Sequence, residues 1–289
     1  MNLVGGPIVA GVDGSDSSYD AARWAAVEAA RRNLPLRLLY VVHPPADGFA
    51  GGTVLSELLE SAEAEARREV DELAATFRDS IEVGTEVLVG PAIPLLVDAS
   101  KDAALMVVGS RGLGGFTGVL VGSVAAALAA HGGCPVAVVR ASSSAGSVVV
   151  GVDGSPASEA AVALAFEEAS LRGVDLVAVH TWRENASDAA FVAAIEPVLD
   201  LDQLQREAEE TLAERLAGWR ENYPDVTVHR AVSRDRPVHA LLAAADGASL
   251  LVVGSRGRGG FSGLLLGSTS QALVYHAPCP LVVARPIAA

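Results

Sequence analysis

One glycine-rich stretch occurs twice in this chain and decides its fold. The first copy is Val107-Val108-Gly109-Ser110-Arg111-Gly112, followed by Gly114-Gly115-Phe116 and Gly122-Ser123. The second copy is Val252-Val253-Gly254-Ser255-Arg256-Gly257, followed by Gly259-Gly260-Phe261 and Gly267-Ser268. In both copies we expect an apolar strand to run into a loop spaced G-x2-G-x9-G-S, after which a helix begins.

Glycine in such a loop lets the backbone take positive φ and come close to a ligand. Where the loop opens a helix, free N–H groups and the positive end of the helix dipole attract an anion. We therefore expect a phosphate site at each copy. The alternative is an ordinary turn that needs glycine. The repetition is no independent support, because simple duplication would also produce it.

The residues around each loop alternate between strand and helix patterns. Ser15 and Asp16 are placed to cap the first helix. In the first copy we expect strands near 7–12, 36–42, 81–89, 105–108 and 136–139, and helices over 19–32, across 59–77, over 94–100 and over 124–130. This order, closed by right-handed crossovers, gives a parallel sheet with helices on both faces.

The pattern restarts at Val148, with Ser155-Pro156 as a stronger helix start than the first copy has. The early elements of the two copies match at an offset of 140 residues and the later ones at 145. The sequence therefore predicts a first domain at 1–140, a linker at 141–146 and a second domain at 147–289. The fold class is α/β, with two tandem doubly wound, Rossmann-like domains. Each is a five-stranded parallel sheet of order 3-2-1-4-5.

Ligands of such sheets bind at the carboxyl ends of the strands, where the strand order reverses. We expect Asp13 and the glycine loop to face each other there, with Asp153 equivalent in the second copy. These carboxylates are candidates to accept from a ribose hydroxyl or to hold Mg²⁺. The alternative is a turn aspartate that bonds its own backbone. Arg111, Arg256 and Arg258 are candidates for phosphate pairing, or are simply solvated.

Composition excludes several classes of function. A net charge of -14 argues against nucleic acid, whose binding depends on cationic side chains. Lys101 is the only lysine and follows no glycine loop, which excludes a P-loop. No apolar run reaches the roughly 20 residues of a membrane-spanning helix, and no signal peptide is evident, so we expect a cytoplasmic protein.

No catalytic constellation emerges, so we do not expect an enzyme. Cys134 and Cys279 each precede a proline at matching positions of the repeat. Two cysteines in a chain of this kind do not make a disulfide framework, and we expect reduced residues with a structural role. His131 and His276 also match by repeat, and we expect each near the end of a helix.

Each half contains the same four motifs: the strand ending in Gly-Val-Asp-Gly-Ser, the Val-Val-Gly-Ser-Arg-Gly loop, the Gly-Ser helix start and the Cys-Pro strand. With these motifs the chain resembles a tandem universal stress protein. The resemblance covers essentially the whole chain and implies ATP binding in both halves. For the first half it implies the binding residues Gly11, Val12, Asp13, Val41, Gly109, Ser110, Arg111, Gly112, Leu113, Gly114, Gly115, Gly122, Ser123 and Val124. For the second half it implies Gly151, Val152, Asp153, Thr181, Gly254, Ser255, Arg256, Gly257, Arg258, Gly259, Gly260, Gly267, Ser268 and Thr269.

The expected function is that of a stress-response regulator that binds one ATP per domain and acts through nucleotide-dependent shape or assembly. A homodimer and an unidentified protein partner are expected, without nucleic acid or membrane. Two other classes of function stay open. One is a slow ATP hydrolase, and the other is an interaction module whose nucleotide site is vestigial.

Overall fold

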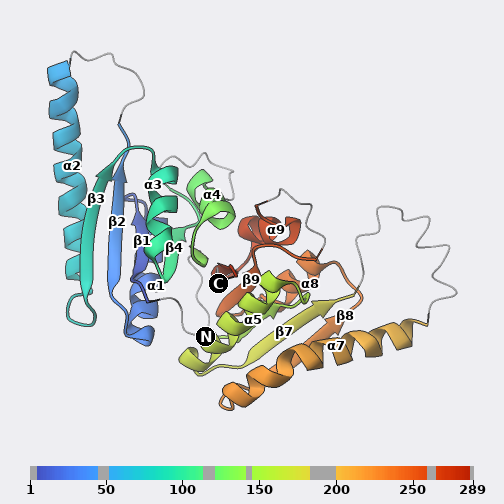
Figure 1. The fold of residues 1–289 in the computed structure, drawn as a ribbon. Helices are drawn as coiled ribbons and strands as arrows, with labels where there is room; N and C mark the ends of the chain where they lie inside the picture. Colours follow the sequence, from blue (N-terminus) through green and yellow to red (C-terminus); the bar gives the residue numbers. More distant parts are fainter. Residues whose placement is uncertain are drawn as a thin grey trace, which may run out of the picture. The chain divides into compact units, whose positions relative to one another are not determined.

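The computed structural model describes residues 5–44, 52–112, 121–140, 145–182, 200–258 and 265–286. The chain divides into two compact units, Met1–Ser142 with Pro280–Ile287, and Ser143–Cys279 with Ala288–Ala289. In each unit strands alternate with helices along the chain (Figure 1). The fold is α/β, as predicted.

The first unit follows the predicted order of elements closely. They are β1 (Ile8–Val12), α1 (Asp16–Arg32), β2 (Leu36–Val42), α2 (Gly52–Ala75), β3 (Val83–Val89), α3 (Ala92–Ala99), a 3₁₀ turn (Ser100–Asp102), β4 (Leu105–Gly109), α4 (Ser123–His131) and β5 (Val136–Val139). Their strand order is β3-β2-β1-β4-β5, all parallel, which confirms the predicted order 3-2-1-4-5. Right-handed crossovers place α1 and α2 on one face and α3 and α4 on the other.

The second repeat has the same elements in the same order. They are β6 (Val148–Gly151), α5 (Pro156–Arg172), β7 (Leu176–Thr181), α7 (Leu201–Asn222), β8 (Val228–Ser233), α8 (Pro237–Ala244), β9 (Leu250–Gly254), α9 (Ser268–His276) and β10 (Leu281–Ala284). The second unit contains the parallel order β8-β7-β6-β9. Strand β10 belongs to the first unit, where it pairs antiparallel with β5.

The compact units and the sequence repeats therefore differ in where they assign β10. By sequence this strand belongs to the second repeat, but in the structure it belongs to the first unit. The physical reason is that β5 would otherwise present an unpaired edge of backbone N–H and C=O groups, which β10 covers. Both strands are buried along their whole length. The domain boundaries predicted from the repeat stay a prediction.

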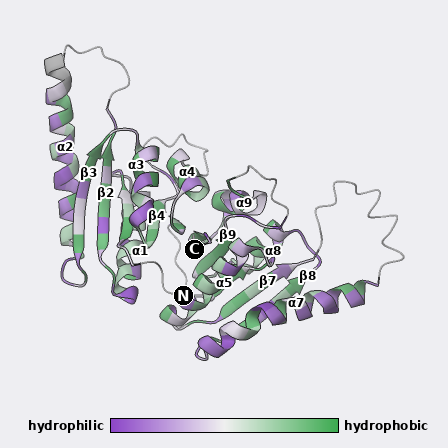
Figure 2. Ribbon diagram, viewed as in Figure 1, coloured by the Kyte–Doolittle hydropathy of each residue, from purple (hydrophilic) through white to green (hydrophobic). Residues whose placement is uncertain are grey.

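The core of each unit lies along its central strands. In β1 and β4, Ile8, Val9, Ala10, Met106 and Val107 have no exposed surface. Figure 2 shows hydrophobic residues concentrated on the strands, while α2 and α7 carry many hydrophilic ones. Such continuous apolar runs are typical of parallel strands covered on both faces. Within the described part of the chain, no helix combines the length and the apolar character needed to cross a membrane.

Local signals read from the sequence fix where the helices begin and end. The Ser15 side chain accepts a hydrogen bond from the Ser18 amide and caps α1, as predicted. Ser155 caps α5 in the same way, with Pro156 in the first turn. His131 and His276 lie in the last turns of their helices, as expected. Cys134 and Cys279 are both buried, and burial raises the pKa of Cys134 to about 12.

Gly109, at the end of β4, lies directly against the first turn of α1. A Cβ atom built on it would stand 2.6 Å from the carbonyl oxygen of Ser17, which is backbone and cannot easily move aside. Gly254 stands in the same relation to the backbone of Ala157, again at 2.6 Å. Glycine is required here because strand and helix pack so closely.

We predict that Gly109→Ala lowers the free energy of unfolding by about 1 to 3 kcal/mol, the usual range for overpacking. Urea denaturation followed by circular dichroism measures this. Gly84→Ala on β3 is the control, because a Cβ atom there would meet nothing within 4 Å. Equal stability of the two variants would contradict the packing argument.

Candidate functional site

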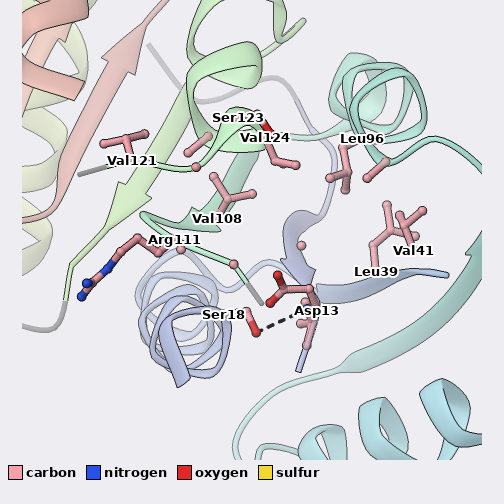
Figure 3. Close-up of a pocket in the computed structure, with 17 residues that line it drawn as sticks. Asp13, Ser18, Leu39, Val41, Leu96, Val108, Arg111, Val121, Ser123 and Val124 are labelled. Carbon is pink, nitrogen blue, oxygen red and sulfur yellow. Dashed lines mark hydrogen bonds between the residues drawn. The ribbon is translucent and has the colours of Figure 1, made fainter. Parts of the chain in front are cut away.

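A cavity of about 440 Å³ opens where β1 and β4 end (Figure 3). Its lining includes most of the binding residues predicted for the first half, namely Gly11, Val12, Asp13, Val41, Gly109, Arg111, Gly112, Gly122, Ser123 and Val124. The fold thus brings Asp13 and the start of the glycine loop together. Leu113, Gly114 and Gly115 lie outside the described residues.

Asp13 holds the turn between β1 and α1. Its Oδ1 accepts hydrogen bonds from the Ser15 amide, at 3.2 Å, and from the Ser15 hydroxyl, at 2.6 Å. Its Oδ2 faces Gly112 so closely that a Cβ atom on Gly112 would collide with it. Asp13 therefore has the turn role, while its second carboxylate oxygen stands between the strand end and the loop.

The glycines at the base of the loop do not have the conformation predicted for them. Among the described residues, positive φ at glycine occurs only at Gly14, Gly90, Gly154, Gly173 and Gly247. The prediction of positive φ is therefore wrong for Gly109, Gly112 and Gly122. Two of these positions need glycine because a neighbouring group lies too close for a side chain. The neighbour is the α1 backbone at Gly109 and the Asp13 carboxylate at Gly112.

Ser110 directly follows β4 and is almost completely buried, and it does not line the cavity. Its carbonyl oxygen accepts from the Gly122 amide at 2.8 Å, and its own amide donates to the Val139 carbonyl oxygen at 3.0 Å. The same bond joins the Gly267 amide to the Ser255 carbonyl oxygen in the second repeat, at 2.8 Å. This bond closes the base of each loop and gives the x9 spacing a structural reason.

Helix α4 begins at this closed loop without a side-chain cap. Its N-cap residue is Gly122, and its first backbone bond runs from the Ala126 amide to the Gly122 carbonyl oxygen. The amides of Ser123, Val124 and Ala125 have no hydrogen-bond partner among the described residues. All three residues line the cavity. Three free amides at a helix N-terminus form a place where an anion is stabilised.

The opposite wall of the cavity is apolar. It is formed by Leu39 and Val41 of β2, by Leu96 of α3 and by Val108 of β4, which Figure 3 shows gathered around one space. The guanidinium of Arg111 extends away from Asp13 (Figure 3). The cavity thus combines an apolar wall with an uncapped helix end.

Several lining residues were not predicted from the sequence. They are Ser18, Leu39, Ala92, Leu96, Val108, Val121 and Ala125. Leu39 could have been found, because it lies two residues before Val41 and therefore on the same face of the strand. The residues of α3 carry no such signal, because only the fold brings that helix over the strand ends.

The second repeat has an equivalent but smaller cavity, of about 130 Å³. Of the predicted residues it is lined by Gly151, Val152, Asp153, Thr181, Gly254, Arg256, Gly257 and Thr269. Ser255 is buried, like Ser110, and the lining does not include Ser255, Arg258, Gly267 or Ser268. Gly259 and Gly260 lie outside the described residues. Leu241 here takes the place of Leu96.

The sequence profile of the universal stress protein family matches residues 6–140 and 145–285. This chain belongs to that family. A universal stress protein of Mycolicibacterium smegmatis is 42% identical over 294 residues, covering 96% of this chain and 97% of the relative. Universal stress protein Rv2005c of Mycobacterium tuberculosis is 42% identical over 290 residues, covering 96% of each.

A solved structure supports the fold of this universal stress protein. The crystal structure of a universal stress protein from Archaeoglobus fulgidus superposes with a TM-score of 0.71. The match covers 99% of this chain and 98% of that one, at 20% sequence identity. At this level of identity the likeness concerns the fold alone.

Asp13 and Asp153 were also the candidates for holding Mg²⁺. In the parts of this universal stress protein that the structure describes, no group of three His, Cys, Asp or Glu side chains is arranged to hold a metal ion. Oδ1 of Asp13 accepts from the Ser15 hydroxyl, and Oδ2 stands beside Gly112. Mg²⁺ at Asp13 would therefore need phosphate oxygens and water as its other ligands.

A carboxylate lies over the turn that carries Asp13. Glu69 of α2 reaches across to Gly14, where a Cβ atom would stand 2.9 Å from its Oε1. The Tyr19 hydroxyl donates a hydrogen bond to Glu69. This bond, followed by burial and the carboxylate charge, raises the pKa of Tyr19 to about 12.

We predict that the contribution of Tyr19 to stability decreases as the pH rises from about 10 to about 12. The folded state holds the proton more tightly than the unfolded chain does, so stability is lost once the phenol ionises. Absorbance titration of the tyrosines should show one group ionising near pH 12, and Tyr19→Phe should remove it. Tyr275→Phe, the control, should leave that step in place. The same titration curve from the Tyr19→Phe protein would refute the bond to Glu69.

Proposed function

We propose that this protein is an ATP-binding regulator and that the cavity of its first repeat holds the nucleotide. The observation that carries the proposal is the row of free amides at Ser123, Val124 and Ala125, which faces a cavity with an apolar wall. ATP has the matching parts, a flat apolar base and an anionic phosphate chain. A volume of about 440 Å³ lies within the usual range for small-molecule sites.

The lining suggests one orientation for the nucleotide. The base would pack against Leu39, Val41 and Leu96, which offer apolar surface. The ribose would lie near Asp13, whose Oδ2 can accept a hydrogen bond from a hydroxyl group. The phosphates would then reach the amides at the start of α4, where the helix dipole favours negative charge.

The phosphates would be held without a lysine. The chain has a single lysine, Lys101, which lies in the 3₁₀ turn after α3 and does not line the cavity. Backbone amides and the helix dipole would supply most of the attraction. Mg²⁺ bound to the phosphates would add charge neutralisation, with Asp13 Oδ2 as its protein ligand.

Regulation requires that the nucleotide bind two states of the protein with different affinity. We propose that occupancy changes the shape or assembly of the chain, read by a second copy or by a protein partner in the cytoplasm. A slow hydrolase would use the same site, and phosphate release in the presence of ATP distinguishes it. An interaction module with a vestigial site would bind no ATP.

We predict that Ser123→Asp weakens ATP binding at least about tenfold, because a carboxylate beside the free amides repels phosphate. The substitution leaves the fold intact, since Ser123 is exposed and an acidic residue stabilises the first turn of a helix. Isothermal titration calorimetry with ATP measures the change.

Ser123→Asn is the matched control, because it has the shape of aspartate without its charge, and it should bind ATP nearly as well as the wild type. Absence of any heat of ATP binding with the wild-type chain would refute the proposed function. Equal affinity of the Asp and Asn variants would show that the phosphates lie elsewhere.

A further inference from the structure

In each repeat one side-chain bond joins the long helix to the helix that follows the first strand. In the first repeat the Tyr19 hydroxyl of α1 donates to the Glu69 carboxylate of α2. In the second repeat the Arg215 guanidinium of α7 donates to the Glu159 carboxylate of α5, at 3.0 Å. Tyr19 and Glu159 match by repeat, so the two bonds lie at equivalent places although their chemistry differs.

The Tyr19–Glu69 bond starts next to the cavity. Tyr19 follows Ser18, which lines the cavity together with Asp13. The Asp13 amide donates to the Ser18 hydroxyl at 3.3 Å (Figure 3), and that hydroxyl donates to the Ser15 carbonyl oxygen at 2.8 Å. Asp13 Oδ1 in turn accepts from the Ser15 amide and hydroxyl. A ligand that binds Asp13 therefore acts on the same short turn that positions the Tyr19 ring.

The other end of the bond lies where two parts of α2 meet. The C-terminal part buries about one residue per turn, namely Ala66, Val70 and Ala74. In the N-terminal part, none of the residues 56–65 is buried. Glu69 lies in the first turn of the buried part. Because tertiary packing supplies most of the stability of a protein helix, the order of residues 56–65 depends on how firmly this turn is held.

The N-terminal part of α2 lies at the edge of the sheet that holds the cavity. Helix α2 follows β2, so it begins at the carboxyl edge of the sheet and runs back alongside β3 (Figure 1). The cavity opens at the carboxyl ends of β1 and β4 in the same parallel sheet. A change in the order of residues 56–65 therefore alters the surface at this edge.

Helix α7 of the second repeat is held differently at its start. Asp200 caps it by accepting from the Gln203 amide at 2.9 Å, and the Trp182 indole donates to Gln205 Oε1 at 2.7 Å. The side-chain amide of Gln205 also donates to the Val232 carbonyl oxygen, at 3.4 Å. The start of α7 is thus fixed by bonds of its own, which makes it an internal reference for α2.

We propose that Tyr19 and Glu69 are positioning residues that couple the first cavity to residues 56–65 of α2, and that these residues become more ordered when the nucleotide binds. This inference rests on the proposed function, because it names the element through which ATP changes the shape of the chain. A nucleotide bonded to Asp13 restricts the turn, the turn fixes the Tyr19 hydroxyl, and the hydroxyl holds Glu69. Such coupling is reciprocal, so order in α2 also strengthens ATP binding.

The test is hydrogen–deuterium exchange of the full chain, followed by mass spectrometry with and without saturating ATP. The amides of residues 56–65 should exchange about fivefold more slowly with ATP, which is the lower end of the usual coupling between two sites. Residues 201–207 of α7 should exchange equally in both conditions. Equal slowing of the two segments would reflect the general stabilisation that any ligand gives, and would overturn the inference.

Tyr19→Phe removes the hydroxyl and should abolish the slowing of residues 56–65 by ATP. It should weaken ATP binding about fivefold at most in isothermal titration calorimetry, because Tyr19 does not line the cavity and the coupling is reciprocal. Glu69→Ala should have the same effects. Glu69→Gln should retain the slowing, since its amide oxygen still accepts from the phenol. Glu72→Ala is the matched control, because it removes an exposed carboxylate of the same helix.

The response to ATP, rather than the exchange rate itself, separates coupling from a purely structural role. If Tyr19→Phe speeds exchange in both conditions but keeps the fivefold response, the bond only stabilises α2 and the inference is wrong. Unchanged exchange of residues 56–65 in wild-type protein that binds ATP would also overturn it, and would leave the proposed function standing. Absence of any heat of ATP binding would overturn the proposed function and the inference together.

Discussion

The hydrogen bond from the Gly122 amide to the Ser110 carbonyl oxygen determines the rest of the site. It joins the first residue after β4 to the N-cap of α4, so the whole glycine loop is closed at its base. The helix begins at Ser123, and the three residues of its first turn, Ser123, Val124 and Ala125, line the cavity. Its equivalent between Gly267 and Ser255 fixes α9 in the same way.

On this common frame the two repeats differ in the side chains that surround it. The backbone arrangement is the same, with an uncapped helix end facing an aspartate at the end of the first strand. The charge over the strand-to-helix turn differs, because Glu69 lies over Gly14 and Arg258 over Gly154.

Much of the fold could be predicted because its signals are local. Residues 36–42 and 136–139 were predicted as strands and are β2 and β5, since continuous apolar runs bounded by turn residues indicate buried strands. Ser15 and Ser155 cap their helices as predicted, because a cap depends on neighbours within three residues. The conformation of Gly109, Gly112 and Gly122 was predicted wrongly. The sequence requires glycine there but does not say which neighbour prevents a side chain.

The sequence by itself determined the α/β class, the succession of strands and helices along the chain and the two glycine loops, because these follow from periodicity and spacing. Only the tertiary structure decided that Leu96 of α3 lines the cavity and that Glu69 and Arg258 reach equivalent turns. It also decided that β10 completes the sheet of the first unit. The physical reason is the same in each case: these contacts join elements through packing across space, and their free energy depends on shapes and charges that no short stretch of sequence contains.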